Sequence, residues 1–99
     1  MDTKYKVVFL AAADQNLLDI DEYLSRFYQN TAADFFEALD KKILLLQDMP
    51  YIGAEFAHDK KYRRLVVGNY VVFYIVDEER HIVEIHRILH GAQDAAQHL

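Results

Sequence analysis

The chain has 99 residues, of which 53% are hydrophobic, and it contains only three glycines and one proline. This length and composition predict one folded domain over residues 1–99 and exclude a disordered or low-complexity chain. Zero cysteines exclude disulfides, cysteine-ligated zinc and a thiol nucleophile.

The net charge of −5 is concentrated in the first part of the chain. Residues 1–57 carry five Lys/Arg and ten Asp/Glu, which gives −5, whereas residues 58–99 carry six of each, which gives 0. An acidic protein repels nucleic acid at long range, so this balance weighs against a general DNA or RNA binder. No apolar run approaches the roughly 18 residues of a membrane span, so we expect a cytoplasmic protein without membrane contact.

The first half of the chain predicts one strand followed by two helices. Residues 4–10 read as a strand, and two stripes of apolar side chains then follow at helical spacing. The break between the stripes at Gln29 and Asn30 predicts a helical hairpin, with Asn30 or Thr31 capping the second helix and Pro50 ending it. The stripes consist of Ala13, Leu17, Ile20, Leu24 and Phe27, and of Ala32, Phe35, Phe36, Leu39, Ile43, Leu46 and Met49.

The last third predicts an antiparallel meander. Two runs of β-branched and aromatic residues flank Gly68-Asn69, a pair suited to the positive φ of a two-residue hairpin turn. A second polar turn over residues 77–80 leads into a third strand over residues 81–90. The predicted fold is therefore α+β with the order β-α-α-β-β-β, in which both helices pack on one face of the sheet.

The strands of the meander are apolar on both faces, although the helical hairpin can cover only one of them. In the middle strand Val71, Phe73 and Ile75 alternate with a second apolar set, and we expect them to be uncovered and available to a partner. The alternative is that residues 51–59 or the C-terminal residues 92–99 fold over this face. In the last strand, alternation places Arg87 and Leu89 on one face with Val83 and Ile85, and Ile82 and Ile88 on the other with Glu84, His86 and His90.

Motifs for common chemistries are weak. His81 is predicted on the opposite strand face from His86, and His86 and His90 are about 13 Å apart along a strand, so a metal site is not expected. Ser25, the single serine, lies within a helix, and the three glycines are isolated, so neither a nucleophile elbow nor a phosphate loop is present. The basic cluster at Lys60, Lys61, Arg63 and Arg64 is either an anion site or an edge strand protected by charge.

Several short motifs in order along nearly the whole chain resemble the ParE/RelE superfamily, the toxin halves of bacterial type II toxin–antitoxin modules. This resemblance implies the fold predicted above, a cognate antitoxin as partner and no cofactor, and it leaves a homodimer open. The motifs are Ala13-Asp14, Leu17 through Ile20 to Tyr23-Leu24, Pro50 to Gly53, Arg64 through Gly68-Asn69 to Tyr70, Phe73-Tyr74, and Arg87 through His90 to Gly91.

The resemblance implies one of two activities. RelE-like members cut mRNA on the ribosome with basic residues on the open sheet face, which would make this chain an enzyme, whereas ParE-like members inhibit DNA gyrase. Val71, Ala92 and Gln93 stand where RelE-like members usually have basic residues, so the ParE-like activity is favoured. A degenerate homologue that binds its antitoxin but is not toxic is a further alternative.

The resemblance also suggests which residues to test. If the protein is a nuclease, Arg64, Arg87 and His90 would carry the reaction, with His98 as a further candidate. Antitoxin or target contacts are expected at Arg63, Arg64, Val71, Phe73, Arg87 and His90. With an uncovered sheet face, Phe73→Ala would weaken antitoxin binding and barely change the melting temperature.

Overall fold

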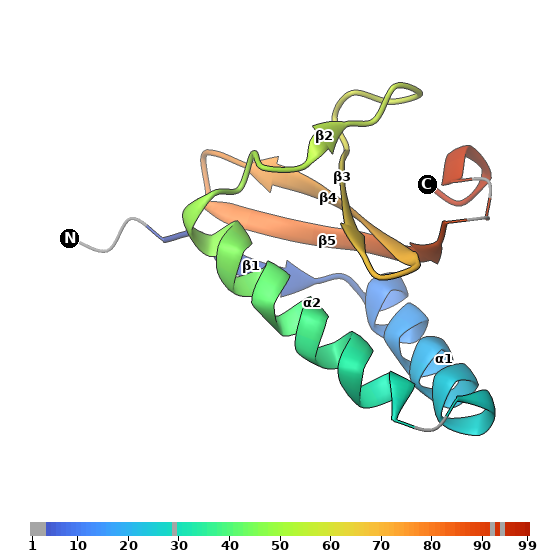
Figure 1. Cartoon of the computed structure of the whole chain (residues 1–99). Coiled ribbons are helices and arrows are strands. Elements are labelled where there is room, and N and C mark those ends of the chain that lie inside the picture. Colours follow the sequence, from blue (N-terminus) through green and yellow to red (C-terminus); the bar gives the residue numbers. More distant parts are fainter. Residues whose placement is uncertain (1–3, 29, 92, 94) are drawn as a thin grey trace.

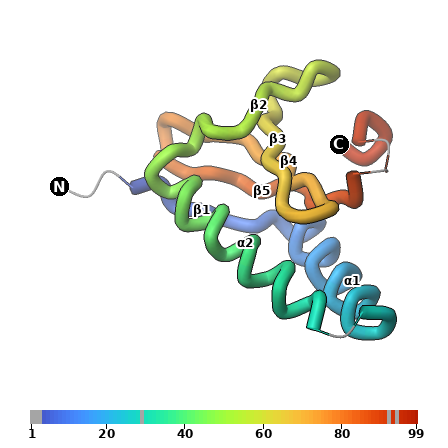
Figure 2. The backbone as a smooth tube through the Cα atoms, viewed as in Figure 1, coloured from blue at the N-terminus to red at the C-terminus, as the bar shows by residue number. Residues whose placement is uncertain are grey.

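The computed structural model describes residues 4–28, 30–91, 93 and 95–99 and confirms the predicted α+β fold (Figure 1). Both long helices lie on one side of a five-stranded sheet, and a short 3₁₀ helix, η1, follows the last strand (Figure 2). Within the described residues, neither long helix combines the length and apolar character needed to cross a membrane. The elements in chain order are β1 (Lys6–Phe9), α1 (Ala11–Phe27), α2 (Thr31–Asp48), β2 (Ala54–Glu55), β3 (Arg63–Val67), β4 (Tyr70–Asp77), β5 (Ile82–His90) and η1 (Ala95–Gln97).

The sheet has the strand order β1-β5-β4-β3-β2. The predicted meander β3-β4-β5 is antiparallel throughout, and β1 pairs with β5 in parallel, which places the first strand at the sheet edge. The two-residue strand β2, which was not expected, pairs with the start of β3. Gly68, with a φ of +59°, supplies the positive φ of the β3–β4 turn at its first central position, as in a type II′ hairpin.

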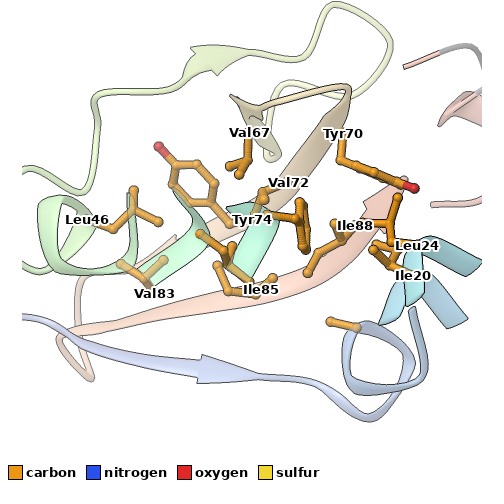
Figure 3. Close-up of a cluster of buried hydrophobic side chains, with 13 residues drawn as sticks. Ile20, Leu24, Leu46, Val67, Tyr70, Val72, Tyr74, Val83, Ile85 and Ile88 are labelled. Carbon is orange, nitrogen blue, oxygen red and sulfur yellow. The ribbon is translucent and has the colours of Figure 1, made fainter. Parts of the chain in front are cut away.

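The main core lies between the helices and the sheet (Figure 3). Side chains such as Leu24 and Leu46 from the two helices pack against Val72, Tyr74 and Ile85 of the sheet, as the helical stripes predicted. Each fully buried side chain of this size contributes roughly 1.5–3 kcal/mol. This cluster therefore fixes the hairpin against one face of the sheet and leaves the other face to be covered by different elements.

The ends of the predicted stripes are exposed. Phe27, at the last position of α1, is 60% exposed and packs on Tyr23 at a ring distance of 5.1 Å. Met49 is also exposed because it is the C-cap of α2, where the backbone leaves helical geometry. Helical periodicity identifies the buried side of a helix, but it does not show how far the helix extends past the sheet.

The turn between the helices differs from the prediction in its chemistry. Asn30 is the N-cap of α2 but has a φ of +67° and makes no side-chain capping hydrogen bond, and Thr31 is already the first helical residue. The backbone carbonyl of Asn30 accepts a hydrogen bond from the amide of Asp34 at 3.3 Å. The prediction of Asn30 as the capping residue is therefore confirmed by its N-cap position, but its side chain does not make the capping hydrogen bond. Gln29 lies outside the described residues.

A β-bulge in β5 changes which residues face the helices. Phe73 pairs with Arg87, but the next residue, Tyr74, pairs with Ile85, so His86 is the extra residue. Ile88 consequently joins the main core, and Leu89 points to the opposite face with Phe73. The predicted sharing of one face by Val83, Ile85, Arg87 and Leu89 was wrong beyond the bulge, since the extra residue reverses the alternation.

The β4–β5 turn is tied to two distant segments through Glu78, which gives a testable pH dependence. The hydroxyls of Tyr5 (2.7 Å) and Tyr51 both donate to Oε1 of Glu78. These two hydrogen bonds, with that from Tyr51 the stronger influence, hold the pKa of Glu78 below its usual 4.5. A lowered folded-state pKa contributes stability that is present above pH 4.5 and is lost as the pH falls through the folded pKa.

We expect Glu78→Ala to be less stable than the wild type at pH 7, and by a smaller margin at about pH 3. Urea unfolding at the two pH values measures the difference. Glu79→Ala, at the exposed neighbouring position, serves as the matched control and should show no such pH-dependent gap. A gap for Glu78→Ala that is equally large at both pH values would contradict the assigned role of the carboxylate.

Candidate functional site

The sheet face opposite the helices carries a second apolar cluster centred on Phe73. Phe73 is only 4% exposed, and its ring meets that of Phe56 edge-on at a centroid distance of 5.2 Å. Tyr62 and Leu89 complete the buried part of the cluster, and Ala95 and Leu99 pack against it. The expectation of an uncovered face at Val71, Phe73 and Ile75 was therefore wrong for Phe73, while Val71 and Ile75 are half-buried.

Two segments form this cover, in agreement with the alternative considered from the sequence. The loop between β2 and β3 folds back on itself, with the amide of Phe56 donating to the carbonyl of Tyr62 at 2.9 Å. The C-terminal segment adds η1 and Leu99, whereas Ala92 lies outside the described residues. The centre of this apolar face, at Phe73 and Leu89, is thus buried by the chain itself, while Val71 and Ile75 remain half-buried.

A pocket of about 210 Å³ remains at the margin of this cover. Arg64 of β3 and His90 at the end of β5 both line it, and the exposed side chain of Arg64 has no hydrogen bond or ion pair among the described residues. His58, which the sequence did not single out, lines it too. The full lining comprises Phe56, His58, Arg64, Val71, Phe73, Leu89, His90, Gly91, Gln93, Ala95 and Ala96.

Arg87 belongs to a different environment. Arg64 and Arg87 are both opposite Phe73, on its two neighbouring strands, so their Cα atoms are about 10 Å apart with Phe73 between them. The Nε of Arg87 donates to the carbonyl of His98 at 2.8 Å, and Arg87 lines a separate pocket with Tyr62 and His86. The structure therefore brings Arg64 and His90 together in one pocket but not Arg87. His98 takes part through its backbone carbonyl, which accepts the hydrogen bond from Arg87.

Arg63 lies on the other face of the sheet from Arg64. Its Nη1 donates to the carbonyls of Gly53 at 2.8 Å and Tyr51 at 3.3 Å, and its guanidinium lies 4.9 Å from the Tyr51 ring centroid. These contacts fix the segment before β2 against β3. The adjacent residues Arg63 and Arg64 consequently have different surroundings, one bonded to the protein and one exposed at the pocket.

The histidines do not converge on a metal site. Among the described residues, no group of three or more His, Cys, Asp or Glu side chains could hold a metal ion. His86 at the bulge packs edge-on against Tyr62, and its buried Nε2 is 3.6 Å from the Glu84 carboxylate, too far for a hydrogen bond. His90 packs edge-on against Tyr70 at 5.4 Å, and its amide donates to the side chain of Gln93 at 2.7 Å.

The fold matches solved structures of small α+β toxins. With a chain of the chromosomal ParDE toxin–antitoxin system of P. aeruginosa the TM-score is 0.72 at 15% identity, over 89% of this chain and 97% of that chain. With the intact RelBE complex of E. coli the score is 0.63 at 16% identity, over 90% and 99%. With the RelBE2 complex of Mycobacterium tuberculosis it is 0.60 at 20% identity, over 88% and 98%. At these identities the likeness establishes the fold.

The family follows from the sequence. The family model described as the ParE toxin of the type II toxin–antitoxin system parDE matches residues 7–95. The chain therefore belongs to this ParE toxin family of type II toxin–antitoxin systems, and it shares its fold with chains of the ParDE and RelBE systems. A search of curated proteins gives no significant match.

Proposed function

We propose that this protein arrests growth by inhibiting DNA gyrase in the cytoplasm and that a cognate antitoxin neutralises it. The observation that carries the proposal is the separation of the three residues a nuclease would use. Arg64 and His90 line one pocket, whereas Arg87 bonds to the His98 carbonyl and lines another. Cleavage of RNA needs a proton acceptor and cationic groups that meet at one phosphate, so this arrangement favours a target other than mRNA.

Three further observations support the same proposal. The matching family model is that of ParE rather than RelE. Val71 and Gln93, two of the residues that replace expected cations, are close to Arg64 in the pocket lining, so they add no positive charge there. Arg63 is turned to the opposite face and bonded to backbone carbonyls.

Ribosome-dependent cleavage of mRNA is the second candidate function. It is favoured by one observation, the shared pocket of Arg64 and His90, to which His58 adds a third basic or titratable side chain. If this were the activity, Arg64 would stabilise the phosphate charge and one of the two histidines would accept a proton.

Induced expression tests the two functions against each other. We expect growth arrest with a raised DNA-damage response and intact mRNA, and inhibition of supercoiling when the purified protein is added to gyrase. Codon-positioned cleavage of ribosome-bound mRNA would overturn the proposal.

Two variants make the comparison sharper. If the protein is a nuclease, Arg64→Ala combined with His90→Ala should reduce cleavage by at least about 100-fold, the usual loss when acid–base groups are removed. Lys41→Ala is the matched control, because Lys41 lies on the exposed side of α2 in an i,i+4 pair with Glu37.

Absence of both growth arrest and gyrase inhibition in the wild type, with antitoxin binding retained, would identify a degenerate homologue. A short neighbouring gene for a DNA-binding antitoxin would support the module.

A further inference from the structure

Outside the Phe73 face, a groove of about 370 Å³ lies at the end of the molecule where α1 meets the sheet. We call it the tyrosine groove. It is continuous with a smaller pocket, since both include Tyr23, Tyr70 and His90, and that pocket extends to Tyr28 and Asn69. The lining of the groove itself is Asp19, Ile20, Tyr23, Tyr70, His90 and Gln93.

The two walls of the tyrosine groove differ in burial. Tyr70 is buried and packs edge-on against Phe35 at 5.1 Å and against His90 at 5.4 Å, so its ring is held in place. Tyr23 on α1 is half-exposed and is 6.0 Å from the ring of Tyr28, which is exposed as well. A buried aromatic ring and an exposed aromatic ring that line one groove are typical of a recognition site rather than of scattered surface residues.

The charge at the rim of this groove indicates which kind of ligand it can bind. Asp19 lies at its rim, where Oδ1 accepts a hydrogen bond from Nε2 of Gln15 at 3.0 Å, and no ion pair among the described residues includes Asp19. The nearest cation along α1, Arg26, is already paired with Glu22 at 2.9 Å. The groove therefore has one carboxylate, Asp19, without an ion pair at its rim and the rings of Tyr23, Tyr70 and His90 in its lining, which suits a cation carried on an apolar stem.

We propose that the tyrosine groove binds an arginine side chain from a short apolar segment of the antitoxin. The identity of this partner rests on the proposed function, whereas the arginine is argued from the groove. A guanidinium stacks flat on tyrosine rings and donates two parallel hydrogen bonds to a carboxylate, neither of which a lysine ammonium can do as well. The segment flanking the arginine would cover the exposed rings of Tyr23 and Tyr28.

The site can be tested by nuclear magnetic resonance with a defined probe. The ¹⁵N-labelled chain is titrated to about 10 mM with acetyl-Leu-Arg-Leu amide and, separately, with the same peptide carrying citrulline, the neutral analogue of arginine. We expect saturable shifts of the amides of Tyr23, Asn69 and Tyr70. The arginine peptide should bind about tenfold more tightly, because the ion pair and the cation–π contact each contribute.

Matched variants assign the preference to Asp19. Asp19→Asn should bind both peptides equally, whereas Asp14→Asn, an exposed position in the first turn of the same helix, should keep the preference for arginine. Shifts elsewhere on the protein, no binding, or a preference that survives in Asp19→Asn would overturn the assignment of the site.

A second measurement tests the partner. Asp19→Lys should weaken binding of the antitoxin encoded beside this chain by at least about tenfold, while the variant still arrests growth when expressed alone. An unchanged antitoxin affinity would overturn the antitoxin as occupant. Failure of the wild type to arrest growth would instead count against the proposed function, and the peptide titration would be unaffected by it.

Discussion

Phe73→Ala should lower the free energy of unfolding by about 3–5 kcal/mol, the usual cost of truncating a buried phenylalanine. Phe73 is 4% exposed and packs with Phe56, Tyr62 and Leu89, so the substitution leaves a cavity beneath the loop and the C-terminal segment. For a domain of about 100 residues this corresponds to a fall in Tm of roughly 15–30 °C. Thermal unfolding followed by circular dichroism measures it.

Val66→Ala is the control for this experiment. Val66 lies on the neighbouring strand β3 and is 62% exposed, so its truncation should change stability by no more than about 0.5 kcal/mol. An unchanged Tm for Phe73→Ala would mean that the loop and the C-terminal segment do not pack on this face in solution, as the sequence first suggested. Because Phe73 is part of the core, loss of antitoxin binding in this variant cannot be taken as loss of a direct contact.

The sequence predicted the helices and the main strands, but it did not show which segments cover the second face of the sheet. Alternation in β4 correctly divided Val72 and Tyr74 from Val71 and Phe73, because one residue per face is a property of any regular strand. It failed beyond His86, where one extra residue reverses the alternation. Bulges leave no periodic signal in a single sequence.

For a related reason, the sequence could not decide whether other segments cover Phe73. Phe56 and Tyr62 come from a loop whose path depends on long-range packing and on hydrogen bonds such as that between their own backbones. Hydrophobic periodicity describes regular elements only, so it could not choose between an exposed face and a covered one.

The candidate site residues lie on different faces and in different pockets, and part of this separation was predictable from the sequence. Arg63 and Arg64 are consecutive in β3, and consecutive strand residues point to opposite faces, so they could not both have lined one pocket. The separation of Arg64 from Arg87 was harder to predict, since it depends on Phe73 pairing between them in the sheet and on the Arg87 hydrogen bond to the His98 carbonyl. The tyrosine groove combines residues from α1, β4 and β5, and only the packed fold brings them together.

Gly53→Ala should be as damaging as Phe73→Ala, for a steric reason. A Cβ at position 53 would lie 2.6 Å from the hydroxyl oxygen of Tyr74 and 2.7 Å from the carbonyl oxygen of Arg64. Neither neighbour can yield, because Tyr74 is fully buried and the carbonyl belongs to the backbone of β3. The Gly53 amide also donates to the Tyr74 hydroxyl at 2.9 Å, and its carbonyl accepts from Arg63 at 2.8 Å.

We therefore expect Gly53→Ala to cost about 3–5 kcal/mol, of which overpacking accounts for roughly 1–3 kcal/mol and the displaced hydrogen bonds for most of the rest. Urea unfolding measures the loss. Gly68→Ala is the matched control: Gly68 has a φ of +59° but nothing within 4 Å of an added Cβ, so it should cost only about 1–2 kcal/mol of backbone strain.

A double-mutant cycle locates the clash. Tyr74→Phe removes the hydroxyl that a Cβ at position 53 would meet, so adding it to Gly53→Ala should recover part of the loss. The contact with the Arg64 carbonyl at 2.7 Å would persist, so recovery should be incomplete. If Gly53→Ala cost no more than Gly68→Ala, the segment before β2 would not be docked against Tyr74. The loop that follows it would then have no fixed starting point from which to cover Phe73.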